Sequence, residues 1–420
     1  MNSKDILIYA SISSLLLMSF ILFQTHRYIE INAVAITNNS AEIVPIKIEA
    51  TIGQGNYVNL NSYIDNNFQY SIKMSDEFIK SIGIENIYQY KISFESNSYY
   101  SSGSSAGLAL TIGKLLLITA PHFDVRNYVF TGVILPFGII GAVSGIDKKY
   151  EAVLKNNKTL IHGNENFKKG LYFNNVFEVY KFITKRDLAK KHKLKIPEWY
   201  NKIMREITLE LCNKTESIAP NSKEFQKALE AIKKGHYYSA ASFCFIANYK
   251  YDKNHTKLEI AEEIREIKKK IEKIKNKVLT IYDAEALGMA LDRLKDAEQN
   301  INNTSYSYWR LQTVKGWLKF VGNTTGIKNY CPNMDLSTYY IYYPFETKIN
   351  KLTCYYDVEK TLFKVYATVL LTYNVSDKKL LSVLPYYQKH FSLWGYTNLE
   401  YYNYTKDKTH LIIALTSFSI

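Results

Sequence analysis

The pattern of apolar and polar positions divides the chain into three parts. Residues 6–23 contain no charged side chain, and an uncharged run of about 18 residues is long enough to cross a bilayer as a helix. The middle part of the chain mixes helical periods with short alternating and β-branched runs, which are typical of strands. In the last part, helical periods dominate. The pattern predicts an N-terminal tail and anchor (1–27), an α+β domain (28–185) and an all-helical domain (186–420).

The α+β part alternates between predicted strands and helices, and several of these meet at glycine-rich segments. Strand signals are alternating apolar positions, and helix signals are apolar positions three and four residues apart. The expected elements are strands within 29–51, a helix at 70–82, a strand at 90–94, a helix at 108–117, a strand at 129–135, a loop at 138–145 and a helix from Ile146.

The helical part carries one clear periodic seam, in which apolar residues alternate by four and three positions. Its members are Ile260, Ile264, Ile267, Ile271, Ile274 and Val278. A seam of fewer than three heptads is typical of a bundle face rather than of a dimerising coil. Residues 228–241 resemble one tetratricopeptide-like turn, and one unit is not an array. We expect this domain to select substrates or contact a partner; the sequence does not define an oligomeric state.

Ser105 is the first candidate for chemistry. It lies in Gly-Ser-Ser-Ala-Gly at 103–107, directly before the predicted apolar helix. The first N–H groups of a helix have no intrahelical partner and are available to an oxyanion. The backbone N–H groups of Ser104, Ser105 and Ala106 are therefore candidate oxyanion donors. The alternative is that this serine is an ordinary turn residue.

Lys149 is the second candidate, because Ile146, Lys149, Tyr150 and Val153 share one face of the predicted helix. Lys149 should therefore be buried and Lys148 solvated. Burial and a helix N-terminus both lower the pKa of a lysine, which a general base requires. Ser144 or Asp147 is expected to cap this helix. The alternative is a solvated Lys-Lys pair without chemistry.

The two segments resemble the motifs of the Lon-type serine protease domain. Residues 103–107 are similar to its nucleophile motif and residues 131–149 to its downstream block, and the similarity covers about residues 30–185. It is seen in particular with archaeal Lon-like proteases that are tethered to the membrane and lack an ATPase. Two departures, Ala142 for a common proline and Ser144 for the usual glycine, affect a loop and remove no reacting atom.

The resemblance implies a membrane-anchored, ATP-independent serine endopeptidase acting on extended or unfolded polypeptides. Ser105 would be the nucleophile, Lys149 the general base and Thr131 the residue that supports the lysine. Two alternatives stay open. One is a catalytically idle Lon-like scaffold that binds partners through its helical domain, and the other is a protease that processes only itself.

The location of the chain depends on its N-terminal run. No Ala-x-Ala-like cleavage site follows residue 23, which favours an uncleaved anchor over a signal peptide. The positive-inside rule gives almost no preference for either orientation of the anchor, because Lys4 lies on one side of it and His26 and Arg27 on the other. Glycosylation sequons all lie beyond the anchor, which favours an extracytoplasmic glycoprotein; they begin at Asn38, Asn157, Asn213, Asn254, Asn302, Asn303, Asn323, Asn374 and Asn403.

The cysteines also bear on location. The chain has four, Cys212, Cys244, Cys331 and Cys354, all in its second half and none in a Cys-x-x-Cys pair. Two disulfides, most simply Cys212 to Cys244 and Cys331 to Cys354, fit an oxidising compartment. Four buried free thiols are the alternative.

Other classes of function have little support in the sequence. The net charge of +14 is spread over helices that also carry glutamates, so no nucleic-acid partner is expected. Gly107 to Lys114 lacks the spacing and the Ser/Thr of a phosphate loop, so ATP is not expected. No zinc-type histidine pair is present, and we expect neither metal nor cofactor. His122 is expected to be a loop residue rather than a catalytic base.

Overall fold

The structure is a computed structural model that describes residues 27–37, 40–58, 63–94, 100–101, 103–333 and 349–420. The span expected at 6–23 lies outside these residues. Among the helices that are described, none combines the length and the apolar character needed to cross a membrane.

The chain forms two compact units. Unit 1 comprises Met1–Lys190 with Leu370–Val383, and unit 2 comprises Lys191–Val369 with Leu384–Ile420. Unit 1 is mixed α/β and the C-terminal part of the chain is helical, as the hydrophobic pattern predicts. The sequence places the first boundary at residue 185, close to the structural one, but it does not predict that 370–383 packs with unit 1.

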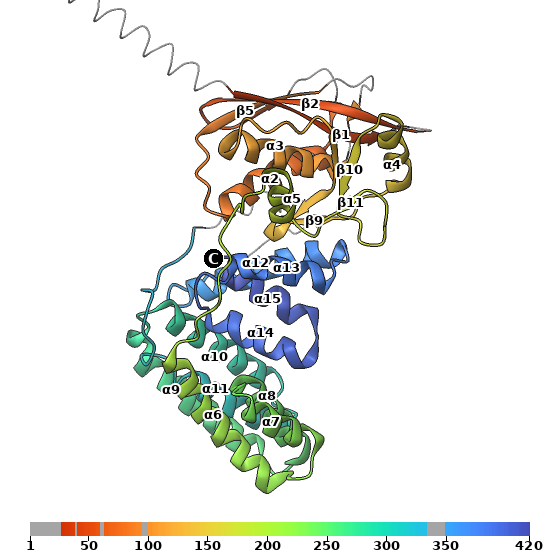
Figure 1. Ribbon diagram of the computed structural model, residues 1–420. Helices are drawn as coiled ribbons and strands as arrows, with labels where there is room; N and C mark the ends of the chain where they lie inside the picture. Colours follow the sequence, from red (N-terminus) through yellow and green to blue (C-terminus); the bar gives the residue numbers. More distant parts are fainter. Residues whose placement is uncertain (1–26, 38–39, 59–62, 95–99, 102, 334–348) are drawn as a thin grey trace, which may run out of the picture. The chain divides into compact units, whose positions relative to one another are not determined.

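Unit 1 is built on a seven-stranded sheet of order β11-β10-β7-β1-β2-β5-β3 (Figure 1). The long strands β1 and β2 are antiparallel, and β7 and β10 run parallel to β1 and to each other. The strands are β1 (Arg27–Ile36), β2 (Ala41–Ile52), β3 (Asn56–Val58), β5 (Tyr88–Phe94), β7 (Tyr128–Thr131), β10 (Thr159–His162) and β11 (Leu171–Tyr172), with a separate pair β4 (Tyr63–Ile64) and β6 (Tyr100–Ser101).

Helices cover both faces of this sheet, because successive residues of β1 point to opposite sides. Helix α3 (Gly107–Thr119) lies against Ile29, Ile31 and Ile48, where a Cβ on Gly113 would fall 2.6 Å from Ile48 Cδ1. Helix α4 (Ile146–Lys155) packs on the other face in a cluster with Val34, Val129 and Leu160. Two further described helices of this unit are α2 (Asn66–Ser81), which packs against α3, and α5 (Val176–Thr184).

The segment after β7 differs from the sequence prediction. The strand expected at 129–135 is interrupted at Gly132, and its second half forms β8 (Val133–Leu135). The loop expected at 138–145 contains β9 (Ile139–Gly141), which is antiparallel to β8. A left-handed turn at Phe137 (φ 66°) and Gly138 (φ 73°) allows the chain to fold back from β8 to β9. The alternation of apolar and polar residues does not predict such a turn.

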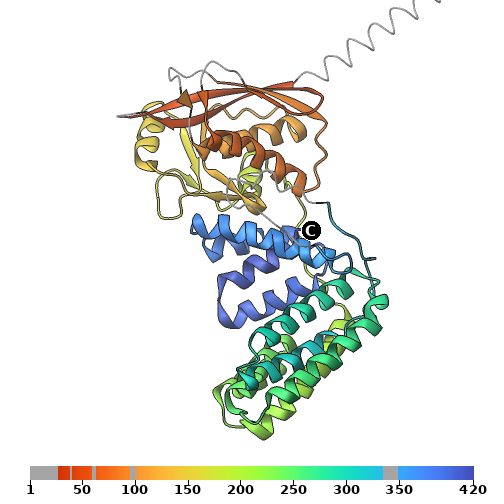
Figure 2. The same cartoon turned by 180° about the vertical axis from the view of Figure 1, so that it is seen from behind.

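Unit 2 consists of helices, several of which lie side by side when seen from behind (Figure 2). Ile260, Ile264 and Ile267 of α9 are buried in its core, so the heptad seam is a bundle face within the chain. The helices are α6 (Glu198–Ile218), α7 (Lys223–Lys233), α8 (Tyr237–Tyr251), α9 (Lys257–Ile274), α10 (Ile281–Gln299), α11 (Thr304–Trp317), α14 (Leu393–Thr405) and α15 (Lys408–Phe418); α12 (Cys354–Thr372) and α13 (Asp377–Tyr387) pass from one unit into the other.

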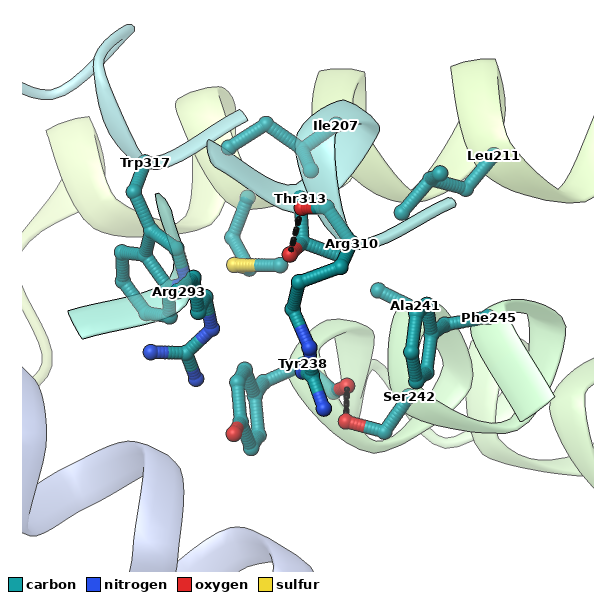
Figure 3. Close-up of a pocket in the computed structure, with 11 residues that line it drawn as sticks. Ile207, Leu211, Tyr238, Ala241, Ser242, Phe245, Arg293, Arg310, Thr313 and Trp317 are labelled. Carbon is teal, nitrogen blue, oxygen red and sulfur yellow. Dashed lines mark hydrogen bonds between the residues drawn. The ribbon is translucent and has the colours of Figure 1, made fainter. Parts of the chain in front are cut away.

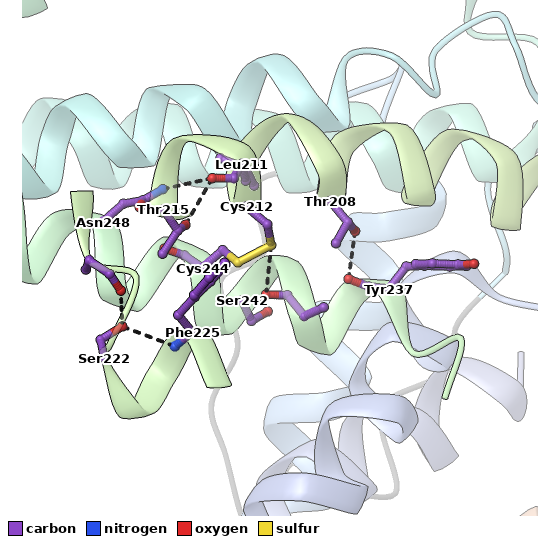
Figure 4. The surroundings of a disulfide bond; sticks show 12 residues. Thr208, Leu211, Cys212, Thr215, Ser222, Phe225, Tyr237, Ser242, Cys244 and Asn248 are labelled. Atoms are coloured by element: carbon purple, nitrogen blue, oxygen red, sulfur yellow. Dashed lines mark hydrogen bonds between the residues drawn. A yellow bond between two sulfur atoms is a disulfide. The ribbon is translucent and has the colours of Figure 1, made fainter. Parts of the chain in front are cut away.

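Two disulfides are present, and they follow the simplest pairing of the sequence. Cys212 of α6 bonds Cys244 of α8 with a Cα–Cα distance of 5.2 Å (Figure 4). Cys331 bonds Cys354 at the start of α12. The first bond joins two helices that also share a hydrogen bond from Thr208 Oγ1 to Tyr237 O, of 2.8 Å.

Candidate active site

Ser105 lies in a single 3-10 turn, η1 (Ser104–Ala106), that leads directly into α3. Gly103 enters this turn with φ 102°, a backbone conformation that side chains with a Cβ rarely adopt. Gly107 leaves it against β8, where a Cβ would lie 3.2 Å from Ile134 N. The two glycines of the motif thus hold Ser105, which is half-buried, in a fixed turn.

Backbone hydrogen bonds fasten this turn to the break between β7 and β8. Gly132 N donates to Ser105 O at 2.9 Å, and Leu108 N donates to Gly132 O at 3.0 Å. Gly132 directly follows Thr131, the last residue of β7. The backbone of Ser105 is therefore bonded to the residue that follows Thr131, the threonine predicted to support Lys149.

Lys149 is buried on α4, with 3% of its surface exposed, whereas Lys148 is exposed. Helical spacing therefore predicts which lysine of the pair is buried. Lys149 Nζ donates to Thr131 Oγ1 at 3.1 Å, and Thr131 is fully buried. Burial lowers the pKa of Lys149 to about 8. In the described part of the chain no carboxylate lies within ion-pair distance of its amine, so no counter-charge there opposes the effect of burial on this pKa.

The predicted cap of α4 is wrong. Neither Ser144 nor Asp147 caps the helix; the N-cap is Gly145, in the left-handed region at φ 61°. The positive φ favours glycine at this position. A Cβ there would also fall 2.1 Å from Ile36 Cδ1, the end of an exposed side chain that would have to move. Asp147 lies exposed in the first turn, and both departures from the family pattern, Ala142 and Ser144, are exposed as well.

The backbone N–H groups expected to form an oxyanion hole belong to η1. Within this turn Gly107 N donates to Ser104 O. The N–H groups of Ser104 and Ser105 come first in the turn, and such leading groups have no acceptor within their own helix. In a 3-10 turn the third N–H, here that of Ala106, points to the carbonyl three residues earlier, so Ala106 is the least available of the three candidate donors. This arrangement is suited to hold a negative oxygen beside Ser105 Oγ.

Lys379 is a residue near this site that sequence reasoning misses. It belongs to the part of α13 that packs in unit 1, and it is 4% exposed. Its Nζ donates to Ile140 O and Gly163 O, and burial lowers its pKa to about 8. Ile140 packs against Gly132, where a Cβ would lie 2.5 Å from Ile140 Cγ2. No local signal distinguishes Lys379 from its exposed neighbour Lys378, because its role comes from contacts more than 200 residues away.

The other residues considered from the sequence lie elsewhere. His122 is exposed in a turn. Gly107 and Lys114 belong to the single helix α3, where Lys114 Nζ meets Asp76 Oδ1 at 2.6 Å. In the described residues, no group of three or more histidine, cysteine, aspartate or glutamate side chains is arranged to hold a metal ion.

No model of a known protein family matches the chain, and no curated protein matches it significantly.

Proposed function

We propose that unit 1 is a Lon-like serine endopeptidase with Ser105 as nucleophile and Lys149 as general base. The observation that carries the proposal is the environment of Lys149, which is buried, bonded to a hydroxyl, and has a pKa lowered to about 8. A lysine must lose its proton to act as a base, and this environment makes the neutral amine accessible near neutral pH.

The proposed reaction follows the standard two-step course of acyl transfer. Neutral Lys149 takes the proton of Ser105 Oγ as that oxygen attacks the peptide carbonyl. The N–H groups at Ser104, Ser105 and Ala106 stabilise the tetrahedral oxyanion. The Lys149 ammonium then protonates the leaving amine, and water, activated by the same amine, hydrolyses the acyl-enzyme. Thr131 holds the amine through its hydroxyl.

We further propose that the enzyme is tethered through residues 6–23, works outside the cytoplasm without ATP, and takes extended polypeptides. Two disulfides in the described chain support an oxidising compartment. An enzyme that works without an ATP-driven unfoldase cannot open compact domains, so its substrates would have to be extended already.

The test is peptide and casein hydrolysis by the full chain in detergent, beside Ser105→Ala. Hydrolysis that the variant loses supports the proposal. Intact peptide together with failure of Ser105 to react with a serine-directed fluorophosphonate would favour the idle scaffold. Cleavage of the chain itself without cleavage of added peptide, seen by mass spectrometry, would favour self-processing.

A further inference from the structure

A pocket in unit 2 opens between four helices. Its volume is about 450 Å³, and this figure includes space that is open to solvent. Its lining comes from positions spaced by three, four and seven residues along α6, α8 and α11, with one residue from α10: Met204, Ile207, Leu211, Tyr238, Ala241, Ser242, Phe245, Arg293, Arg310, Thr313 and Trp317.

The pocket has an apolar floor and a cationic side. Met204, Ile207 and Leu211 are buried and form the apolar floor, where an apolar group would be removed from water. Phe245 and Trp317 are also buried, and the guanidinium groups of Arg310 and Arg293 lie over their rings. Figure 3 shows the guanidinium groups of Arg293 and Arg310 on the Tyr238 side of the cavity, away from Ile207 and Leu211. None of the residues lining the pocket is acidic.

Arg293 is the cation available to a ligand. Its side chain bonds Met289 O at 3.2 Å and stacks on Trp317, with Cζ 5.1 Å from the ring centroid. Among the described residues no carboxylate lies within ion-pair distance of it. Arg310, in contrast, pairs with Asp296 at 2.8 Å.

The acidic groups nearest to Arg293 on its own helix are already engaged. Asp292 accepts from Tyr356 Oη at 2.9 Å and from Lys360 Nζ at 2.6 Å. Asp296 accepts from Tyr306 Oη at 2.6 Å in addition to its pair with Arg310. The pocket therefore carries an uncompensated positive charge above an apolar floor, which complements a carboxylate joined to an apolar group.

Two hydroxyls at the pocket favour a peptide over a simple fatty acid. Ser242 Oγ donates to Tyr238 O at 3.0 Å, and Thr313 Oγ1 donates to Arg310 O at 2.7 Å. Each hydroxyl has its hydrogen committed and keeps a lone pair that accepts from an N–H group. A peptide supplies such N–H donors and a hydrocarbon chain does not.

The walls of the pocket are held in place by the Cys212–Cys244 disulfide. Cys212 directly follows Leu211 on α6, and Cys244 directly precedes Phe245 on α8, so the disulfide joins two helices that line the cavity. A site with fixed walls loses less conformational freedom when it binds. From these observations we propose that this pocket binds the carboxyl-terminal residue of a polypeptide, with its apolar side chain on the floor and its carboxylate on Arg293.

The test is calorimetric titration of the full-length Ser105→Ala protein in detergent, so that no peptide is consumed and binding is measured apart from the proposed hydrolysis. The probe is an acetylated Gly/Ser hexapeptide ending in leucine, used as the free acid and as the C-terminal amide. We expect the acid to bind at least about tenfold more tightly than the amide, equivalent to about 1.4 kcal/mol. Equal affinities would overturn the proposal.

Matched variants identify the cation. Arg293→Gln should weaken binding of the acid at least about tenfold, whereas Lys295→Gln, which removes the same charge from an exposed position of the same helix, should change it by less than about twofold. Arg293→Lys, which keeps the charge, should recover part of the loss and guards against a folding defect. If Arg293→Gln and Lys295→Gln lowered the affinity for the acid equally, the effect would come from the overall charge of the protein, and the assignment of the site to Arg293 would be wrong. Competition by N-acetylleucine as strong as that of the peptide would assign the pocket to small carboxylic acids and overturn the chain-end assignment.

Discussion

Two buried lysines of unit 1, Lys114 on α3 and Lys149 on α4, differ in their partners. Lys114 has no exposed surface, and its Nζ bonds Asp76 Oδ1 at 2.6 Å and Asn56 Oδ1 at 2.7 Å. Lys149 is 3% exposed, and its one hydrogen-bond partner among the described residues is the hydroxyl of Thr131, at 3.1 Å. Burial lowers the pKa of both, but at Lys114 the Asp76 carboxylate opposes this effect, and at Lys149 no charge does.

The difference shows that burial alone does not make a lysine a base. A carboxylate partner stabilises the ammonium, so Lys114 is suited to tie α3 to α2, which carries Asp76. A hydroxyl partner accepts a hydrogen bond from the ammonium without adding a charge, so Lys149 can become neutral while it stays in place. The predictions that follow test this contrast, beginning with the largest expected effect.

The first prediction concerns the two adjacent lysines of α4. Lys149→Ala should lower kcat for peptide hydrolysis by about 10²- to 10⁴-fold, the range that a general base contributes. Lys148→Ala should change kcat by less than about twofold, because Lys148 is exposed. Similar losses in the two variants would contradict the assignment of the base.

The second prediction compares stability. Asp76→Asn should lower the free energy of unfolding of unit 1 by about 3 kcal/mol, because it leaves the buried Lys114 ammonium without its counter-charge. Lys149→Met should instead raise it by about 2 kcal/mol at pH 7, since burial disfavours the ammonium there and lowers the pKa of Lys149 from 10.5 to about 8. The gain should be complete below pH 8 and fade as the pH rises to 10.5, where the unfolded lysine also becomes neutral.

Hydrogen exchange of α3 measured by mass spectrometry reports these changes, because core amides exchange through global opening. Tryptophan fluorescence serves as the control, since Trp199, Trp309, Trp317 and Trp394 all lie in unit 2. A loss of stability in both variants would show that the two lysines play the same structural role.

The same contrast marks the limit of sequence reasoning. Helical spacing selects Lys149 over Lys148 because burial on one helix face is a local property. Spacing does not find the partners of Lys114, because Asn56 and Asp76 come from distant segments. The β8–β9 return was missed for a related reason: it depends on left-handed backbone at Phe137 and Gly138, which side-chain alternation does not encode. The cap at Gly145 likewise depends on left-handed backbone, at φ 61°.

The third prediction is the pH dependence of activity. The active form needs neutral Lys149, so kcat/KM should rise about tenfold per pH unit below the pKa of about 8 and level off above it. His122→Ala should leave this profile unchanged, because His122 is exposed in a turn. A limb near pH 6.5, the usual imidazole value, that disappears in the His122 variant would identify a different base.

The smallest expected effect is at Thr131, which is fully buried and touches the amine of Lys149. Thr131→Val keeps the shape and removes the hydroxyl, so the plateau of kcat should fall about fivefold, equivalent to about 1 kcal/mol for one lost hydrogen bond. The ammonium also loses its only acceptor among the described residues, so the pKa of Lys149 should fall further and the limb of the pH profile should move to lower pH. Thr131→Ser, which restores the hydroxyl, should return the limb to its original position. A lower plateau with no movement of the limb would show that Thr131 supports packing alone and does not act through the lysine.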